Sequence, residues 1–197
     1  MTPAGPETDE ELMVRLRTGQ DSALNSLMER WEVPLRRFLF RYLQSDAQAL
    51  DIAQEVFVKI YQNRDRFSPG RRFSTWMFAI ATNLARNHLR WRKRHPSESL
   101  DGSSAVDLAK EDSLRDDVTP ADRLGSVERA GAVREAISLL PEELKAPLLL
   151  FEYEDLQQAE IAQVLGCSAK AVESRLYRAR GLLRRTLERF LTESSRV

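Results

Sequence analysis

Apolar residues recur at spacings of three and four along most of this chain, and this periodicity constrains its fold more than any other feature. The period runs through residues 9–43, 46–63, 74–94 and 133–191. Alternation of apolar and polar residues, as expected for strands, is absent over any useful length. The sequence therefore predicts an all-α protein.

Composition divides these helices into two domains. Residues 97–122 are rich in Ser, Asp and Gly and carry eight acidic residues against two basic ones. A segment with so few aromatic residues and so much charge buries too little apolar surface to fold alone. We therefore expect helical domains at 8–95 and 127–192, joined by a flexible acidic linker at 96–126.

The charges cancel over the whole chain but are segregated along it. Thirty basic residues balance thirty acidic ones. Residues 71–94 nevertheless hold seven basic residues and no acidic one, and residues 170–189 hold seven basic against two acidic. Two basic patches separated by an acidic segment are typical of a protein that binds nucleic acid.

Several classes of function lack the residues that they need. Cys167 is the only cysteine and there are two histidines, so we expect no disulfide, metal site or cofactor. Neither a nucleophile–base pair nor a phosphate-binding glycine loop is present, so we expect no enzyme. The first dozen residues are polar and acidic, and no apolar run approaches the roughly 18 residues that span a bilayer. We therefore expect a soluble, cytoplasmic protein.

The segment 157–191 has the pattern of a helix-turn-helix. A short helix precedes the turn at Gly166 and Cys167, and Ser168 is placed to cap the longer helix that follows. Arginines on that helix can pair bidentately with guanine in a major groove. An amphipathic hairpin with solvated arginines is the alternative. Glu173 would repel phosphate, although its carboxylate can accept from a cytosine amino group.

Three stretches together resemble the extracytoplasmic-function (group 4) sigma factors of bacterial RNA polymerase, in the sigma-70 family. They are "DIAQEVFVKIYQNRDRF", "RRFSTWMFAIATNLARNHLRWRKR" and "LPEELKAPLLLFEYEDLQQAEIAQVLGCSAKAVESRLYRARGLL". The resemblance covers nearly the whole chain. It implies a non-catalytic initiation factor that binds core polymerase, melts the minus-ten element and recognises minus-thirty-five DNA.

The resemblance also assigns residues in the N-terminal domain. "DIAQEVFVKIY" is similar to the helix that docks on the clamp helices of the large polymerase subunit. The flap of the same subunit is a further contact that the resemblance implies. A solvated helix face is the alternative for these polar residues. The expected core-polymerase contacts are Asp51, Gln54, Glu55 and Lys59.

"DRFSPGRRFSTW" is similar to the loop that captures a base flipped out of the minus-ten element. Phe67 is the preferred pocket residue, and Asn83 matches a position that contacts an adjacent base. The spacing of Phe73 and Trp76 favours core packing over stacking, and Ser74 is placed to cap the helix. The expected minus-ten contacts are Asp65, Phe67, Ser68, Gly70, Arg71, Trp76, Asn83, Arg86, Arg90, Arg92 and Lys93.

In the C-terminal domain the resemblance implies a minus-thirty-five reading face. Its expected residues are Ser168, Lys170, Glu173, Ser174, Arg175, Tyr177 and Arg178. The acidic linker is expected either to thread the polymerase cleft or to act as a plain tether. Further expected partners are double- and single-stranded promoter DNA and an anti-sigma factor, with no small-molecule substrate and no membrane insertion.

Two other classes share part of this pattern. A response regulator carries a similar helix-turn-helix, but it would need a receiver domain with parallel strands, and residues 10–95 show no strand pattern. A helical protein-interaction module with no DNA role would leave both basic patches without a purpose. Run-off transcription with core polymerase separates these classes.

Overall fold

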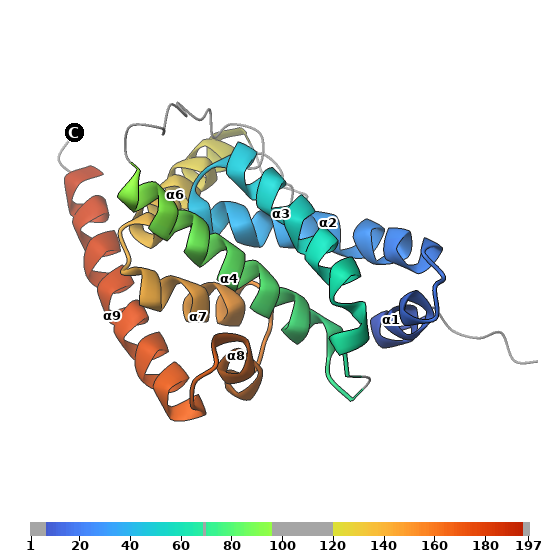
Figure 1. The fold of residues 1–197 in the computed structure, drawn as a ribbon. Coiled ribbons are helices and arrows are strands. Elements are labelled where there is room, and N and C mark those ends of the chain that lie inside the picture. The colour runs from blue at the N-terminus through green and yellow to red at the C-terminus, as the bar shows by residue number, and fades with distance from the viewer. Residues whose placement is uncertain (1–6, 69, 96–119, 195–197) are drawn as a thin grey trace, which may run out of the picture.

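The computed structural model describes residues 7–68, 70–95 and 120–194, and within these residues the chain is helical, as predicted (Figure 1). The expected linker lies outside the described residues from 96 to 119. Residues 120–126, where composition and the start of the second helical set overlap, begin a helix with Pro120 in the first position. The elements are α1 (Asp9–Arg17), α2 (Ser22–Leu43), α3 (Asp46–Gln62), the 3₁₀ turn η1 (Arg64–Arg66), α4 (Phe73–Arg94), α6 (Pro120–Ser138), α7 (Glu142–Glu152), α8 (Gln158–Leu165) and α9 (Ala169–Ser194).

The N-terminal helices share one core. Helix α2 contacts α1, α3 and α4, and aromatic rings fill the space between α2 and α4. The rings of Phe38 and Phe78 lie edge to face with their centroids 5.1 Å apart, and Trp31 approaches Phe78 at 6.1 Å. This geometry is the favoured one for aromatic pairs, so it fixes α4 against α2.

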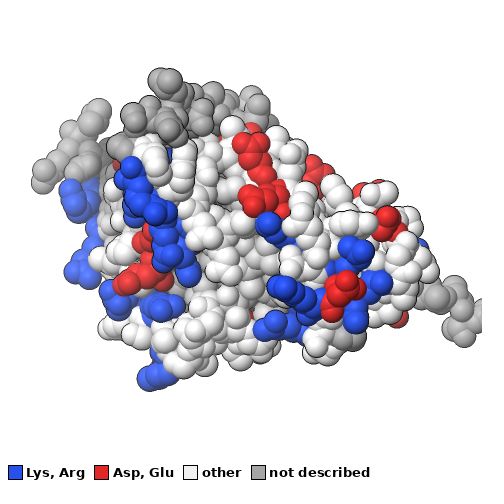
Figure 2. All heavy atoms as spheres, viewed as in Figure 1, with Lys and Arg blue, Asp and Glu red and all other residues white. Residues whose placement is uncertain are grey.

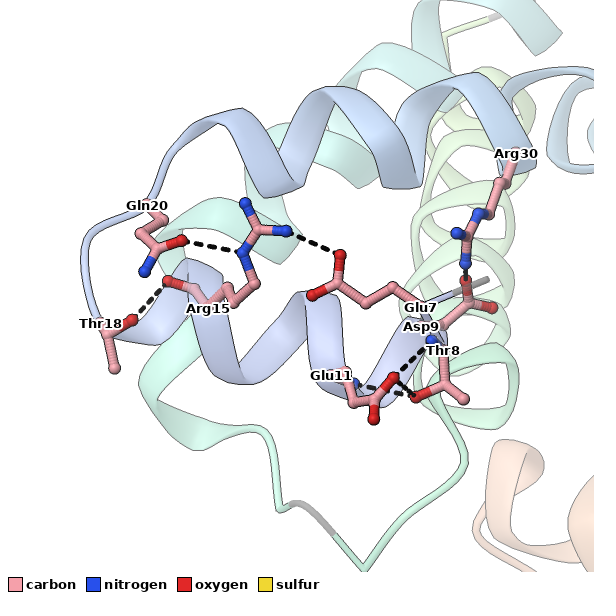
Figure 3. Close-up of polar contacts among 8 residues, drawn as sticks. All are labelled: Glu7, Thr8, Asp9, Glu11, Arg15, Thr18, Gln20 and Arg30. Atoms are coloured by element: carbon pink, nitrogen blue, oxygen red, sulfur yellow. Dashed lines mark hydrogen bonds and ion pairs between the residues drawn. The ribbon is translucent and has the colours of Figure 1, made fainter. Parts of the chain in front are cut away.

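Polar contacts fix the first helix on this core (Figure 3). Thr8 and Glu11 form a capping box: the Glu11 backbone N–H donates to Thr8 Oγ1 at 3.2 Å, and the Thr8 N–H donates to Glu11 Oε2 at 2.7 Å. Asp9 accepts from Trp31 Nε1 at 2.8 Å and pairs with Arg30 at 3.0 Å. Helix α1 therefore begins at a defined residue and is held on α2.

The C-terminal helices are built around α7, which contacts both α8 and α9. Leu144, Ile161, Val172 and Leu176 are buried between them. The two sets of helices also pack against each other: α4 lies on α8, and α2 contacts α6 and α7 (Figure 1). Over the described part of the chain, no helix combines the length and the apolar character needed to cross a bilayer.

Candidate nucleic-acid interface

The segment that joins α3 to α4 is braced by the first helix. A carboxylate oxygen of Glu10 accepts a hydrogen bond from the Phe73 backbone N–H at 2.7 Å, at the first turn of α4. Arg17 Nη1 donates to the Phe67 carbonyl oxygen at 3.3 Å. The expected cap at Ser74 is not formed, because the Ser74 hydroxyl is buried and has no hydrogen-bond partner. Glu10 satisfies the helix N-terminus in its place.

Phe67, the expected pocket residue, has a buried side chain. Its side chain is only 2% exposed, and its ring lies 5.3 Å from Trp76 and 6.4 Å from Phe73. After the 3₁₀ turn the backbone at Phe67 is extended, and the ring enters the core. Phe73 is also buried, as its spacing predicted, whereas Trp76 is only partly buried. The Phe67 ring therefore packs against Trp76 from the side of the core.

An open hollow of about 300 Å³ lies beside this segment, between α3 and α4. It brings together the aromatic ring of Trp76, the exposed amide of Asn83 and two cations, Lys59 and Arg66. The sequence placed Lys59 with the polymerase contacts, and it missed Arg66 although Arg66 adjoins Asp65. We call this feature the base hollow; its lining residues are Lys59, Asn63, Arg66, Trp76, Ile80, Asn83 and Leu84.

Basic side chains continue from this segment along α4. Figure 2 shows them around the α3–α4 connection and over the C-terminal half of α4. Arg92 donates to Gln48 at 3.3 Å, and burial, followed by the charge of Arg92, lowers the pKa of His88. His88 therefore adds no cation here near neutral pH. The remaining expected minus-ten residues lie outside the base hollow: Asp65, Ser68, Gly70 and Arg71 on the exposed connection and Arg86, Arg90, Arg92 and Lys93 on α4.

Helix α3 presents a polar face that is separate from the base hollow. Asp51, Gln54 and Glu55 are exposed, whereas the stripe that contains Ile52 and Val56 is buried, as the period predicted. Acidic side chains gather over α3 in Figure 2. Val58 lies one turn further on and is 51% exposed. The sequence did not indicate this exposure, because Val58 ends a run of three apolar residues, 56–58. We call Asp51, Gln54, Glu55 and Val58 the α3 ridge.

The C-terminal helices form the predicted helix-turn-helix. Helix α8 ends at Gly166, whose φ of 61° is the left-handed conformation that favours glycine. Ser168 caps α9, since its Oγ accepts from the Ala171 backbone N–H at 3.2 Å. Arg175 Nη1 donates to Cys167 Sγ at 3.5 Å, which holds this arginine over the turn. The turn is therefore fixed at both of its ends.

The outer face of α9 carries the expected reading residues around a broad, open depression. Tyr177 lines this depression and is 82% exposed. Lys170 pairs with Glu173 at 2.9 Å, which offsets the acidic charge that was expected to repel phosphate, and Arg178 pairs with Glu143 at 3.1 Å. The depression holds Lys170, Glu173, Ser174, Tyr177 and Arg178 of the expected set, together with Arg184 and Arg185, which were not expected.

The C-terminal domain carries a helix-turn-helix, and the N-terminal domain carries an aromatic hollow with cations at its rim. These two features place the chain among helical DNA-binding transcription proteins. Residues 27–95 match the family described as Sigma-70 region 2, and residues 130–183 match Sigma-70, region 4. The RNA polymerase sigma-H factor of Pseudomonas aeruginosa is 32% identical over 189 residues, which cover 95% of this chain and 98% of that protein. The ECF RNA polymerase sigma-E factor of Escherichia coli is 33% identical over 174 residues, covering 88% and 91%.

Solved structures share the fold of this chain. CnrH, solved in complex with the cytosolic domain of CnrY, has a TM-score of 0.68 at 26% identity and covers 92% of this chain and 98% of its own. The sigma factor RpoE of Bartonella quintana shares the fold, with a TM-score of 0.64 at 20% identity over 83% of this chain and 97% of that one. The chain belongs to the extracytoplasmic-function sigma factors of the sigma-70 family. It is a non-catalytic initiation factor that directs RNA polymerase to promoters.

Proposed function

We propose that the base hollow receives a base flipped out of the minus-ten element. The observation that carries this proposal is the combination of Trp76, Asn83 and two cations around one open hollow. Unstacking a base costs a few kcal/mol, and stacking on an aromatic ring returns roughly 1–3 kcal/mol. The amide of Asn83 pairs with a base edge, while Lys59 and Arg66 hold the strand.

The outer face of α9 takes the major groove of the minus-thirty-five element. Tyr177 and Ser174 are exposed there, and Lys170 and Arg178 make only exposed ion pairs. Such pairs contribute about 1 kcal/mol or less, so DNA phosphates and bases compete for these cations at little cost. Arg184 and Arg185 extend the same face along the backbone.

The α3 ridge binds the core polymerase. A row of polar side chains with one exposed valine at its end suits a partner helix, because the valine adds apolar contact to charged recognition. Functional domains at 8–95 and 127–192, joined by an acidic connection that ends in the first turns of α6, complete this assignment, and the site of action is the cytoplasm. An anti-sigma factor is a further proposed partner, supported by family membership and by RpoE of Bartonella quintana, which was solved with the anti-sigma factor NepR.

Run-off transcription tests the proposal. Core polymerase and this chain first enrich DNA from a random-sequence library, and the enriched DNA then serves as template. Transcripts of one defined length are expected only when the chain is present. Transcripts without the chain, or none with it, contradict the proposal.

The α3 ridge is tested by co-migration of the variant D51R/E55R with core polymerase. Reversing both charges is expected to weaken co-migration with core polymerase at least about tenfold, because like charges then face each other. The variant E29R/E32R makes the same change in charge at two exposed positions of α2 and should leave co-migration unchanged. If D51R/E55R and E29R/E32R lose co-migration equally, the effect comes from net charge alone, and the α3 ridge is not part of the interface.

A further inference from the structure

A hollow of about 230 Å³ lies where α2 meets α6 and the C-terminal end of α7. Part of its lining is apolar: Phe40 and Ile137 are buried, and Val133 packs against the same core. Most of the remaining lining is cationic, with two arginines from each of the two long helices. We call this feature the arginine hollow; its cations are Arg37 and Arg41 of α2 and Arg129 and Arg134 of α6.

Aromatic rings hold two of these cations at the hollow. The Arg41 guanidinium lies 4.1 Å from the centroid of the Tyr153 ring, and that of Arg134 lies 5.8 Å from the centroid of Phe40. Contacts of this kind are attractive, and they orient a long side chain that would otherwise sample many rotamers. Among the described residues that line the hollow, none is acidic. The guanidinium groups are therefore gathered around one apolar space.

Glu154 is a carboxyl close to the hollow, since the charges of Arg41 and Arg37 act on it. Burial nevertheless raises the pKa of Glu154 to about 7, and the charge of Asp155 acts in the same direction. This carboxyl is only partly ionised near neutral pH, whereas arginine stays protonated. Positive charge is therefore in excess around the hollow.

Two segments at this hollow have an uncommon backbone conformation. Gln44, which lines the hollow, ends α2 with a φ of 60°, and Asp155, two residues after Tyr153, has a φ of 50°. In the described part of the chain, these are the two non-glycine residues with positive φ. Gln44 Nε2 also donates to the Arg41 carbonyl oxygen at 2.6 Å, which fixes the end of α2. Backbone strain of this kind clusters at ligand-binding and switch sites.

We propose that the arginine hollow binds a small amphipathic anion, an apolar ring or short chain that bears a carboxylate or phosphate head. The body packs on Phe40, Val133 and Ile137, and the head lies between guanidinium groups, which bind such oxyanions bidentately. The size fits, because an apolar cavity of about 150 Å³ already holds benzene. This ligand-binding role goes beyond the proposed function and does not rest on it.

Titration of the full-length chain with four probes tests the chemistry of the site. Benzoate and phenyl phosphate carry a ring and an oxyanion, benzamide carries the ring without a charge, and inorganic phosphate carries the charge without a ring. Ligand-detected NMR should show saturable binding of both ring anions, with a Kd on the order of 1 mM or below. Benzamide and inorganic phosphate should each bind at least about tenfold more weakly. The tighter of the two ring anions assigns the head as carboxylate or phosphate.

Substitutions test the location of the site. R129Q/R134Q should weaken binding of the ring anions at least about tenfold, because two charged hydrogen-bond donors are lost. The control R184Q/R185Q removes the same charge at two exposed positions of α9 and should bind as wild type does. A130F leaves the charge unchanged and should also abolish binding, because position 130 lines the hollow and a phenyl ring there fills it.

The proposal fails if neither ring anion binds saturably, or if benzamide binds as tightly as benzoate. Both of these comparisons use the unchanged chain, so they decide the matter even where a variant does not fold. Full binding in A130F, or equal loss in R129Q/R134Q and R184Q/R185Q, would also overturn the site. No measurement here needs polymerase or DNA, so the result is independent of run-off transcription.

Discussion

Glu10 connects the first helix to the segment that joins α3 to α4, because its carboxylate caps α4 at the Phe73 backbone N–H. We expect E10A to lower the free energy of unfolding by about 1 kcal/mol, the usual cost of a lost N-cap. E10Q should lose less, since an amide oxygen still accepts. Urea denaturation measures both, with E29A as a surface control expected within about 0.5 kcal/mol of wild type. If E10A is as stable as wild type, the Glu10 cap on α4 does not stabilise the fold.

Glu154 gives stability a dependence on pH. Burial raises the pKa of its carboxyl to about 7 from 4.5, although Arg41 and Arg37 oppose the shift. The folded chain therefore holds this proton more tightly than the unfolded chain, and stability falls as pH rises from about 4.5 to 7.

The variant E154Q removes this titration. At pH 8 it should be more stable than wild type by an amount on the order of 1–3 kcal/mol, and near pH 4.5 the two should be similar. Urea denaturation at the two pH values measures the difference, and E29Q should show no such change between them. A constant difference across this range would contradict a raised pKa at Glu154.

At the scale of single residues, the sequence indicates position along a helix, but the exposure of a side chain in a loop depends on packing. Asn83 is exposed at the base hollow, where the family pattern placed a base contact. Phe67 and Trp76 are both aromatic and near the same loop, but the bend after η1 buries the first and leaves the second at the surface. No periodicity in the sequence encodes that bend. Their roles in DNA binding remain predictions.

At the scale of elements, the helix-turn-helix was predictable because its signals are local. A short apolar period, a glycine and a serine cap are read within a dozen residues, and the structure places Gly166 and Ser168 in those roles. At the start of α6, composition and local signals overlap. The acidic composition extends to residue 122, whereas Pro120 already occupies the first position of the helix, where proline is favoured.

Two glycines give a matched test of these elements. G166A should destabilise the chain by roughly 1–2 kcal/mol, because a φ of 61° is costly for any residue with a Cβ atom. G131A, inside α6, should stabilise it by about 0.5–1 kcal/mol through helix propensity. A Cβ meets nothing within 4 Å at either position, so packing does not confuse the comparison. Thermal unfolding measures both, and a shift of the same sign in the two variants would contradict this account.

At the scale of the whole molecule, the sequence predicted two helical domains but not their contact. Arg72 and Glu160 are 88 residues apart, and nothing local marks either as a partner of the other. The same holds for Lys93 and Glu142. Long-range ion pairs depend on how two finished domains meet, so only the folded chain reveals them.

Promoter opening by the holoenzyme tests the central claim, which is a division of labour between the base hollow and the outer face of α9. W76A/N83A should reduce permanganate reactivity of minus-ten thymines at least about tenfold, since stacking and an amide contact are both lost. Its footprint over the minus-thirty-five element should remain. Y177A/R178A should instead lose that upstream footprint. Wild-type reactivity in W76A/N83A, or loss of both signals in both variants, would contradict the division.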